Sequence, residues 1–177
     1  MQCGYLRAFL GGSILALAVC ALAANQEKIE PAPRFSARSV DGEKFDNASI
    51  KGKVTLLEFW TTWCHYCAAE APVVEKLSQE FKDQGLTVLA VNVGESKKTV
   101  KKYLEQHPRT CRVVLTEDTN LAAMYQATVY PIYVVIDREG NVVRTQRGAG
   151  GERALRHSLA RAGIGSSDFA DDQDSDP

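Results

Sequence analysis

The chain has 177 residues, of which 45% are hydrophobic and 24% are charged, and its formal net charge at neutral pH is −1. A single domain of this size buries enough apolar surface to fold without a disulfide framework or a structural metal. The near-neutral charge argues against a nucleic-acid binder, since such proteins carry a marked excess of Lys and Arg. The five Cys are too few for a disulfide scaffold, and their odd number leaves at least one thiol without a partner in the chain.

The first 23 residues have the pattern of an export signal. Arg7 is followed by an apolar run, residues 8–24, which carries no charge. Small residues at Ala21 and Ala23 stand where signal peptidase requires them, so cleavage is expected after Ala23. An uncleaved N-terminal membrane anchor and a lipidated Cys20 are the alternatives. Each reading places the domain in the periplasm or another extracytoplasmic space, with membrane association only through this segment.

The rest of the chain divides into three parts by composition. Residues 24–34, with two Pro, are typical of a linker, and residues 35–163 carry the periodic apolar pattern of a folded domain. Residues 164–177 have five Asp in the last ten positions and no apolar periodicity. This composition predicts a disordered acidic tail.

The expected elements of the domain begin with a hairpin around Asp41-Gly42. The nearly continuous apolar run over residues 54–60 predicts a central strand buried on both faces. Further strands are expected over residues 86–93, 111–115, 132–136 and 142–147. Helices are expected over residues 64–84, 96–106, 121–125 and 152–162. A βαβ beginning and a ββα end predict an α/β fold with a mixed central sheet and helices on both faces.

The chemistry is expected at Cys64-His65-Tyr66-Cys67, which lies at the start of the first long helix. Two Cys separated by two residues at a helix start bring both sulfur atoms to the same helix end. The first sulfur lies over the unpaired amides of the helix N-terminus, where the helix dipole favours a thiolate. Cys64 is therefore the predicted nucleophile, and Cys67, one turn into the helix, is placed to resolve the mixed disulfide.

Other uses of a Cys-x-x-Cys pair fit the sequence less well. A c-type haem site needs His directly after the second Cys, where the chain has Ala68. A structural zinc needs four ligands, but there is no second Cys pair, and His107 and His157 lie on separate predicted helices. An inert structural disulfide stays open, although it would not require the position between strand and helix. No metal and no cofactor is expected.

The segment from Glu58 to Pro72 resembles the active-site strand, turn and helix of the thioredoxin superfamily. More narrowly, it is similar to the exported TlpA/ResA type of thiol-disulfide oxidoreductase, whose pattern runs Phe-Trp-x-x-Trp-Cys-x-x-Cys-x-x-Glu-x-Pro. The similarity extends over about residues 33–162. It implies a thioredoxin fold with an N-terminal β-hairpin and a central β/α insertion between Cys67 and Pro131.

The resemblance draws attention to Glu58, six positions before Cys64. Thioredoxins carry at this position a buried Asp that exchanges protons with the second Cys, whereas many TlpA-type proteins have Asn. A carboxyl in an apolar central strand without a charge partner would have a raised pKa and could accept a thiol proton near neutral pH. The alternative is that Glu58 lies at the strand end and reaches solvent.

The resemblance assigns roles to four more residues. Glu70 would tune both thiols from one helical turn beyond Cys67, the alternative being a solvated helix charge. Pro131 would be the cis proline of the loop that faces the Cys pair, exposing the Tyr130 backbone to an extended substrate. The alternative for Pro131 is an ordinary trans proline that opens an edge strand. Trp63 would shield the disulfide.

These features predict an exported enzyme that acts on protein dithiols and disulfides. The resemblance implies that it reduces its substrates, in some members apocytochrome c or copper-site thiols, with electrons from a membrane-bound donor. One alternative is a peroxiredoxin-like peroxidase, although Thr61-Thr62-Trp63-Cys64 differs from the peroxidatic arrangement. The other is a copper-binding assembly chaperone, which would need a His near the Cys pair beyond His65. Cys111 is expected to be a small buried hydrophobe, with a regulatory or intermolecular thiol as the alternative.

Overall fold

Strand β4 (Val54–Trp60) is the centre of the fold, because each of its seven side chains is buried. In the computed structural model, which describes residues 30–165, β4 lies inside an eight-stranded sheet of order β1-β8-β7-β4-β5-β6-β2-β3. It pairs in parallel with β5 (Leu86–Asn92) and antiparallel with β7 (Ile132–Ile136). The continuous apolar run thus forms a strand covered on both faces, as predicted.

The other strands extend the sheet on both sides of this centre. β6 (Arg112–Thr119) pairs in parallel with β5, and the hairpin of β2 (Ser36–Ser39) and β3 (Lys44–Asp46) joins β6 antiparallel. On the opposite side, β8 (Asn141–Arg147) pairs antiparallel with β7, and the short β1 (Glu30–Pro31) pairs with the beginning of β8. The predicted N-terminal hairpin and mixed sheet are therefore present.

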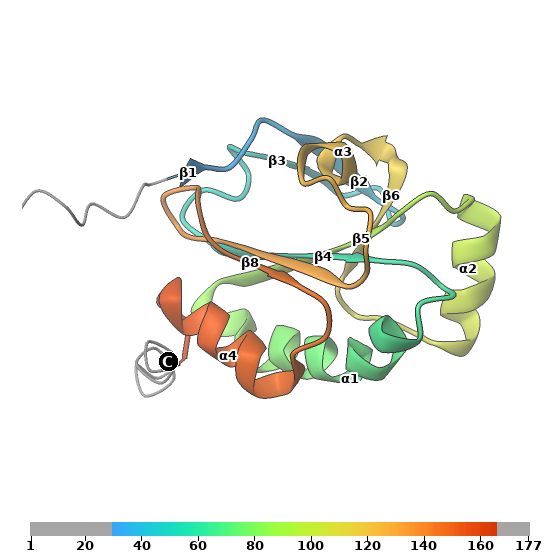
Figure 1. The fold of residues 1–177 in the computed structure, drawn as a ribbon. Coiled ribbons are helices and arrows are strands. Elements are labelled where there is room, and N and C mark those ends of the chain that lie inside the picture. Colours follow the sequence, from blue (N-terminus) through green and yellow to red (C-terminus); the bar gives the residue numbers. More distant parts are fainter. Residues whose placement is uncertain (1–29, 166–177) are drawn as a thin grey trace, which may run out of the picture.

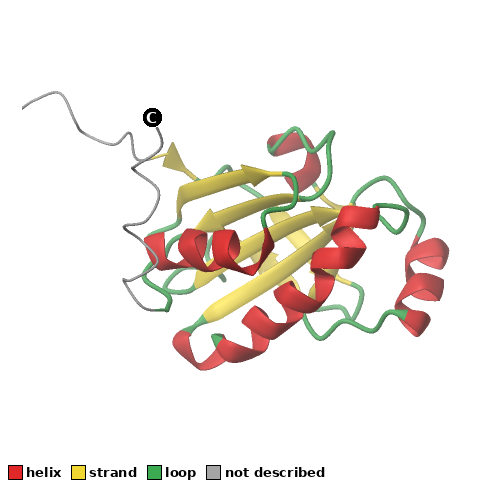
Figure 2. Cartoon of the chain, turned by 60° about the horizontal axis from the view of Figure 1, so that its bottom comes forward, coloured by secondary structure: helices red, strands yellow, loops and turns green. Residues whose placement is uncertain are grey.

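Helices cover both faces of the sheet (Figures 1 and 2). α1 (His65–Glu80) and α4 (Gly151–Arg161) lie together on one face, and a short 3₁₀ helix, η2 (Lys82–Gln84), follows α1. α3 (Leu121–Met124) covers the other face, and α2 (Lys97–Gln106) lies at the end of the sheet near the start of α1. Between β5 and β7 the chain forms α2, β6 and α3, which are the helix, strand and helix that the sequence predicts there.

The alternation of side chains along β4 separates two hydrophobic cores. Leu56 and Trp60 belong to the core beneath α1 and α4, whereas Leu57 and Phe59 belong to the core beneath α3. Glu58 stands between Leu56 and Trp60, so its carboxyl enters the core on the α1 side. This placement brings a titratable group under the helix that starts with the Cys pair.

The ends of several elements differ from the sequence prediction. β6 continues to Thr119, beyond the apolar run, because its polar second half pairs with β2 through Ala37 and Thr119. Residues 30–34, assigned to a linker, partly join the sheet: β1 pairs with β8, and the Ala32 amide donates to the Gly140 carbonyl over 2.9 Å. A short polar or Pro-containing segment gains these contacts from tertiary pairing, which composition does not reveal.

The C-terminal boundary also differs, because Ile164 is buried although the acidic tail was expected to begin there. Gly163 has a φ of 79°, which lets the Gly163 and Ile164 amides donate to the carbonyls of Ala160 and Leu159. This is the Schellman arrangement, which turns an apolar residue back against the helix. Ile164 accordingly packs in the same core as Leu159.

The predicted export signal and almost all of the acidic tail lie outside the described residues. Within residues 30–165, none of the helices combines the length and the apolar character needed to cross a membrane.

Candidate active site

The two Cys of the motif lie where β4 leads into α1, and a disulfide joins them. Cys64 is the N-cap of α1, and its sulfur accepts a hydrogen bond of 3.1 Å from the Cys67 amide. Cys64 is 7% exposed and Cys67 is 2% exposed. Cys64, at the helix start, is thus slightly more exposed than Cys67, and the roles of nucleophile and resolving Cys stay predictions.

A carboxylate that the sequence did not point to holds the loop before Cys64. Glu95 accepts hydrogen bonds from the Thr62 amide and from the Asn92 side chain, both over 2.7 Å, and also from the Thr62 hydroxyl. These groups meet because the parallel strands β4 and β5 end side by side, with Trp60 opposite Asn92. The turn that presents Cys64 is therefore fixed to the neighbouring strand.

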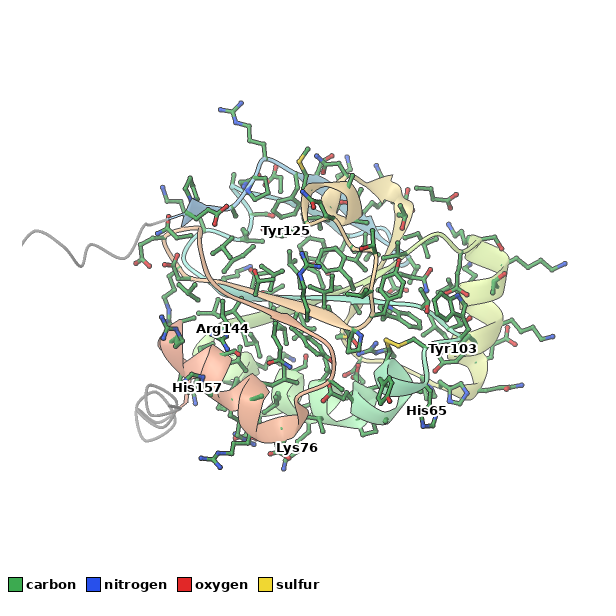
Figure 3. All side chains as sticks on the ribbon, viewed as in Figure 1. His65, Lys76, Tyr103, Tyr125, Arg144 and His157 are labelled. Atoms are coloured by element: carbon green, nitrogen blue, oxygen red, sulfur yellow. A yellow bond between two sulfur atoms is a disulfide. The ribbon has the colours of Figure 1, made fainter. Side chains whose placement is uncertain are left out.

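Exposed aromatic side chains surround the disulfide. Trp63 is 71% exposed and Tyr66 is 65% exposed, which is unusual for side chains of this size. The Trp63 and Tyr130 rings meet edge to face, with centroids 5.8 Å apart, and the Tyr130–Pro131 peptide bond is cis. His65 projects away from the sheet beneath the start of α1 (Figure 3). This aromatic rim offers apolar contact area directly beside the Cys pair.

Glu58 is fully buried in the middle of β4, so the alternative of a solvent-exposed strand end is wrong. The expectation that Glu58 lacks a charge partner is also wrong. Its Oε2 accepts a hydrogen bond of 2.6 Å from Nη2 of Arg109, whose side chain is only 4% exposed. Burial raises the pKa of Glu58 by more than the charge and hydrogen bond of Arg109 lower it.

Arg109 is held in turn by further contacts with α1 and β4. Its Nε donates to Oε1 of Glu75 on α1 over 3.2 Å, and its guanidinium lies over the Trp60 ring at 5.4 Å from the centroid. Glu75 also accepts hydrogen bonds from the amide and hydroxyl of Thr110. Burial opposes ionisation of Glu75, but the Thr110 hydrogen bonds and the nearby Arg109 lower its pKa overall.

A cavity of about 400 Å³ lies between α1 and α2, directly beside Cys67. Tyr103, on the sheet side of α2, forms part of its wall (Figure 3). The wall also includes Cys67, Trp60, Glu75 and Arg109. The resolving Cys and the buried guanidinium therefore border the same space.

Glu70 is 5% exposed, so it is not the solvated helix charge that the sequence left open. Its Oε2 accepts a hydrogen bond of 2.8 Å from the Tyr133 hydroxyl. Its Oε1 accepts hydrogen bonds from the Gly150 amide, over 2.9 Å, and from the Gly151 amide. These are the first amides of α4, so Glu70 acts as a cap supplied by another helix.

Comparison with known proteins supplies the family. The family model described as Redoxin matches residues 27–162 of the chain. The chain belongs to the redoxin family. Its curated relatives include the "Thiol-disulfide oxidoreductase ResA" of Bacillus subtilis strain 168, which is 33% identical over 80% of this chain and 86% of that protein. The protein of the same name from Halalkalibacterium halodurans is 30% identical over 73% of this chain and 74% of its own length.

Solved structures agree with this assignment. A putative thiol:disulfide interchange protein DsbE from Chlorobium tepidum superposes with a TM-score of 0.69 and 26% identity, over 78% of this chain and 99% of that chain. The protein is thus a ResA-like thiol-disulfide oxidoreductase with a thioredoxin fold, and a disulfide joins the two Cys of its Cys-x-x-Cys motif, Cys64 and Cys67.

The third Cys of the described part of this oxidoreductase is placed as expected for a hydrophobe. Cys111 is 5% exposed and packs in the core beneath α1. Burial raises the pKa of its thiol strongly, which opposes the reactive thiolate form.

Two residues of the site, Arg109 and Glu95, have sequence signals too weak to identify them. A buried carboxylate such as Glu58 requires a partner, but the sequence does not say which of the many Lys and Arg side chains supplies it. Arg109 is brought to it only by the return of the chain from α2 to β6. Glu95 lies shortly after the end of β5, the strand beside β4, and this position is the one feature of the sequence that indicates its role.

Proposed function

We propose that this oxidoreductase works outside the cytoplasm and reduces disulfides in exported proteins. The observation that carries the proposal is the Cys64–Cys67 disulfide at the start of α1, set beneath an exposed aromatic rim. The export pattern of the first 23 residues supports the compartment. The similarity to proteins named as ResA thiol-disulfide oxidoreductases supports the chemistry.

In the proposed reaction, the reduced enzyme transfers two electrons to a substrate disulfide. The Cys64 thiolate attacks one substrate sulfur, the substrate disulfide breaks, and the displaced substrate thiolate takes up a proton. Cys67 then loses its proton and attacks Cys64, which breaks the mixed disulfide and releases the second substrate thiol. The products are the enzyme disulfide and a substrate dithiol.

Each turnover leaves the enzyme oxidised, so a reductant must restore the dithiol. We place a membrane-bound thiol donor in this role, because the extracytoplasmic space lacks the cytoplasmic thiol pool. Among substrates, apocytochrome c with an oxidised Cys-x-x-Cys-His segment is the class we favour. Trp63 and Tyr66 would contact the extended substrate chain around its disulfide.

The copper-chaperone and peroxidase alternatives gain no support from the site. Within the part of the chain that the structure describes, no group of three or more His, Cys, Asp or Glu could hold a metal ion. Cys64 is paired with the Cys one turn away, which suits dithiol exchange directly.

The reduction potential of the Cys64–Cys67 pair, measured against glutathione, tests the proposed direction of electron transfer. A value below about −250 mV supports a reductase, and a value near −120 mV would make the enzyme an oxidant. Cys64→Ser should abolish the reduction of insulin and of an oxidised apocytochrome c peptide. Cys67→Ser should accumulate the mixed disulfide on Cys64, visible as a mass increase equal to the substrate. Activity retained by Cys64→Ser would refute the mechanism.

A further inference from the structure

The buried pair of Glu58 and Arg109 joins β4 to the segment between α2 and β6. Both side chains are almost completely removed from water, at 0% and 4% exposure. Burying two ions is costly, and apolar side chains of similar volume would often give equal or greater stability. Arg109 also comes from the segment between α2 and β6, far in sequence from the redox motif. Such a pair calls for a functional explanation.

One observation places the pair near Cys67, and two describe the oxygens of Glu58. Arg109 and Cys67 line the same cavity, which is large enough to hold several water molecules. Arg109 binds only one oxygen of the carboxylate, Oε2, over 2.6 Å. The other oxygen, Oε1 of Glu58, is buried without a hydrogen-bond partner. A buried carboxylate is therefore fixed at one oxygen and left with a free acceptor at the other.

We propose that Arg109 is a positioning residue that fixes the Glu58 carboxylate and keeps it ionised, so that Glu58 can accept the proton of Cys67 when the mixed disulfide is resolved. This inference rests on the proposed function and deepens it. In the step, the Cys67 proton passes to Oε1 of Glu58, directly or through water in the cavity. The Cys67 sulfur bonds to the Cys64 sulfur, the bond from Cys64 to the substrate breaks, and the substrate thiolate takes a proton from solvent. Glu58 later returns its proton to water.

The charges around Glu58 explain why an arginine is needed. Burial raises the pKa of Glu58, and Glu75 and Glu70 on α1 raise it further, while Arg109 is the group that lowers it. Tyr133, opposite Glu58 in the β4–β7 ladder, and Cys111, directly before β6, are also nearby, and both are neutral at physiological pH. Tyr103 and His107 are the other titratable side chains that line the cavity. Without Arg109, the pKa of Glu58 would rise further, which would favour the protonated carboxyl and make Glu58 less available as a base.

The test isolates the second half of the reaction. The reduced full-length protein, with Cys3→Ser and Cys20→Ser in every variant, is mixed with an aromatic disulfide that releases a coloured thiolate. The first release reports attack by Cys64, and the second reports resolution by Cys67. The rate of the second release is recorded between pH 5 and pH 9 for the parent, Arg109→Gln, Arg109→Lys and Glu58→Gln, and for Arg109→Gln combined with Glu58→Gln.

We expect Arg109→Gln to slow resolution at pH 7 by about tenfold, and to move the midpoint of the pH profile upward by about one unit. Arg109→Lys should restore most of the rate, because it keeps the charge. The combined variant should match Glu58→Gln alone, because Arg109 then has no carboxylate to act on. Arg112→Gln, which removes a surface arginine paired with Glu43, is the matched control and should leave the profile unchanged.

A purely structural role would lower the rate equally at every pH, and the combined variant would be slower than Glu58→Gln alone. Either result overturns the inference. If Arg109→Gln does not fold, Arg109→Lys still tests the inference. The lysine ammonium keeps the charge but loses the geometry of the guanidinium, so the midpoint of the pH profile must move upward by a smaller amount. A reduction potential typical of an oxidant would refute the proposed direction of electron transfer, but the release of the second thiolate could still be measured. Failure of the proposed function and failure of this inference can therefore be told apart.

Discussion

Replacing Glu70 with Ala should destabilise the protein by about 3 kcal/mol. Glu70 caps the first amides of α4, and losing an N-terminal cap costs about 1 kcal/mol. It also accepts a hydrogen bond of 2.8 Å from the Tyr133 hydroxyl, and a bond to an ionised group contributes about 1.5–3 kcal/mol. The Ala variant leaves that hydroxyl and both amides without their partner in a buried place.

The assay is denaturation of the oxidised protein in guanidinium chloride. The midpoint should fall while the slope with denaturant stays constant, because the exposed area on unfolding is unchanged. Glu70→Gln keeps an acceptor oxygen for the α4 amides and should lose about half as much. Glu105→Ala on the exposed face of α2 is the control, and should change stability by less than about 0.5 kcal/mol.

A loss below about 1 kcal/mol for Glu70→Ala would refute the capping role. If that variant also shifted the potential of the Cys64–Cys67 pair, the tuning of both thiols implied by the family resemblance would be the better description of Glu70.

Four further outcomes are expected. Because the pKa of Glu58 is raised, the folded state holds this proton more tightly than the unfolded chain, so stability should fall as pH rises above 4.5 through the raised value. Glu58→Gln should remove that fall, and equal slopes between pH 4 and pH 8 in both proteins would contradict the assignment. Ile164→Asp should cost about 3 kcal/mol or more in thermal or chemical unfolding, because it places a charge in the core; a smaller loss would mean that Ile164 is not held there. Cys111 should resist iodoacetamide in the native protein and react only on unfolding, as followed by peptide mass spectrometry; rapid native labelling would show an accessible thiol. Trp63→Ala should leave stability within about 0.5 kcal/mol but raise the KM for protein substrates, and an unchanged KM would remove Trp63 from the substrate surface.

The parts of the fold that follow local pattern were predictable from the sequence. The apolar run of β4 and the turn at Asp41-Gly42 each determine their structure through nearby residues, and so does the Cys pair at a helix start. The contacts of Glu58 and Glu70 were not predictable, since their partners, Arg109 and the start of α4, lie more than fifty positions away. A sequence pattern shows that a buried carboxylate needs a partner, but only the path of the chain decides which one.

The position of Ile164 was hidden for a related reason. A single apolar residue between a glycine and an acidic stretch has no periodicity of its own. Its burial depends on the helix that precedes it and on the left-handed turn at Gly163.

Both ends of the described chain leave the domain on the side away from the redox disulfide. β1 and the end of α4 lie together at one end of the molecule, and the start of α1 lies at the other (Figure 1). Anything attached before Glu30 or after residue 165 therefore joins the domain at the end opposite the disulfide. A membrane tether at the N-terminus would point the disulfide outward toward approaching proteins, and a purification tag or a surface linkage at either terminus would leave the reactive face open.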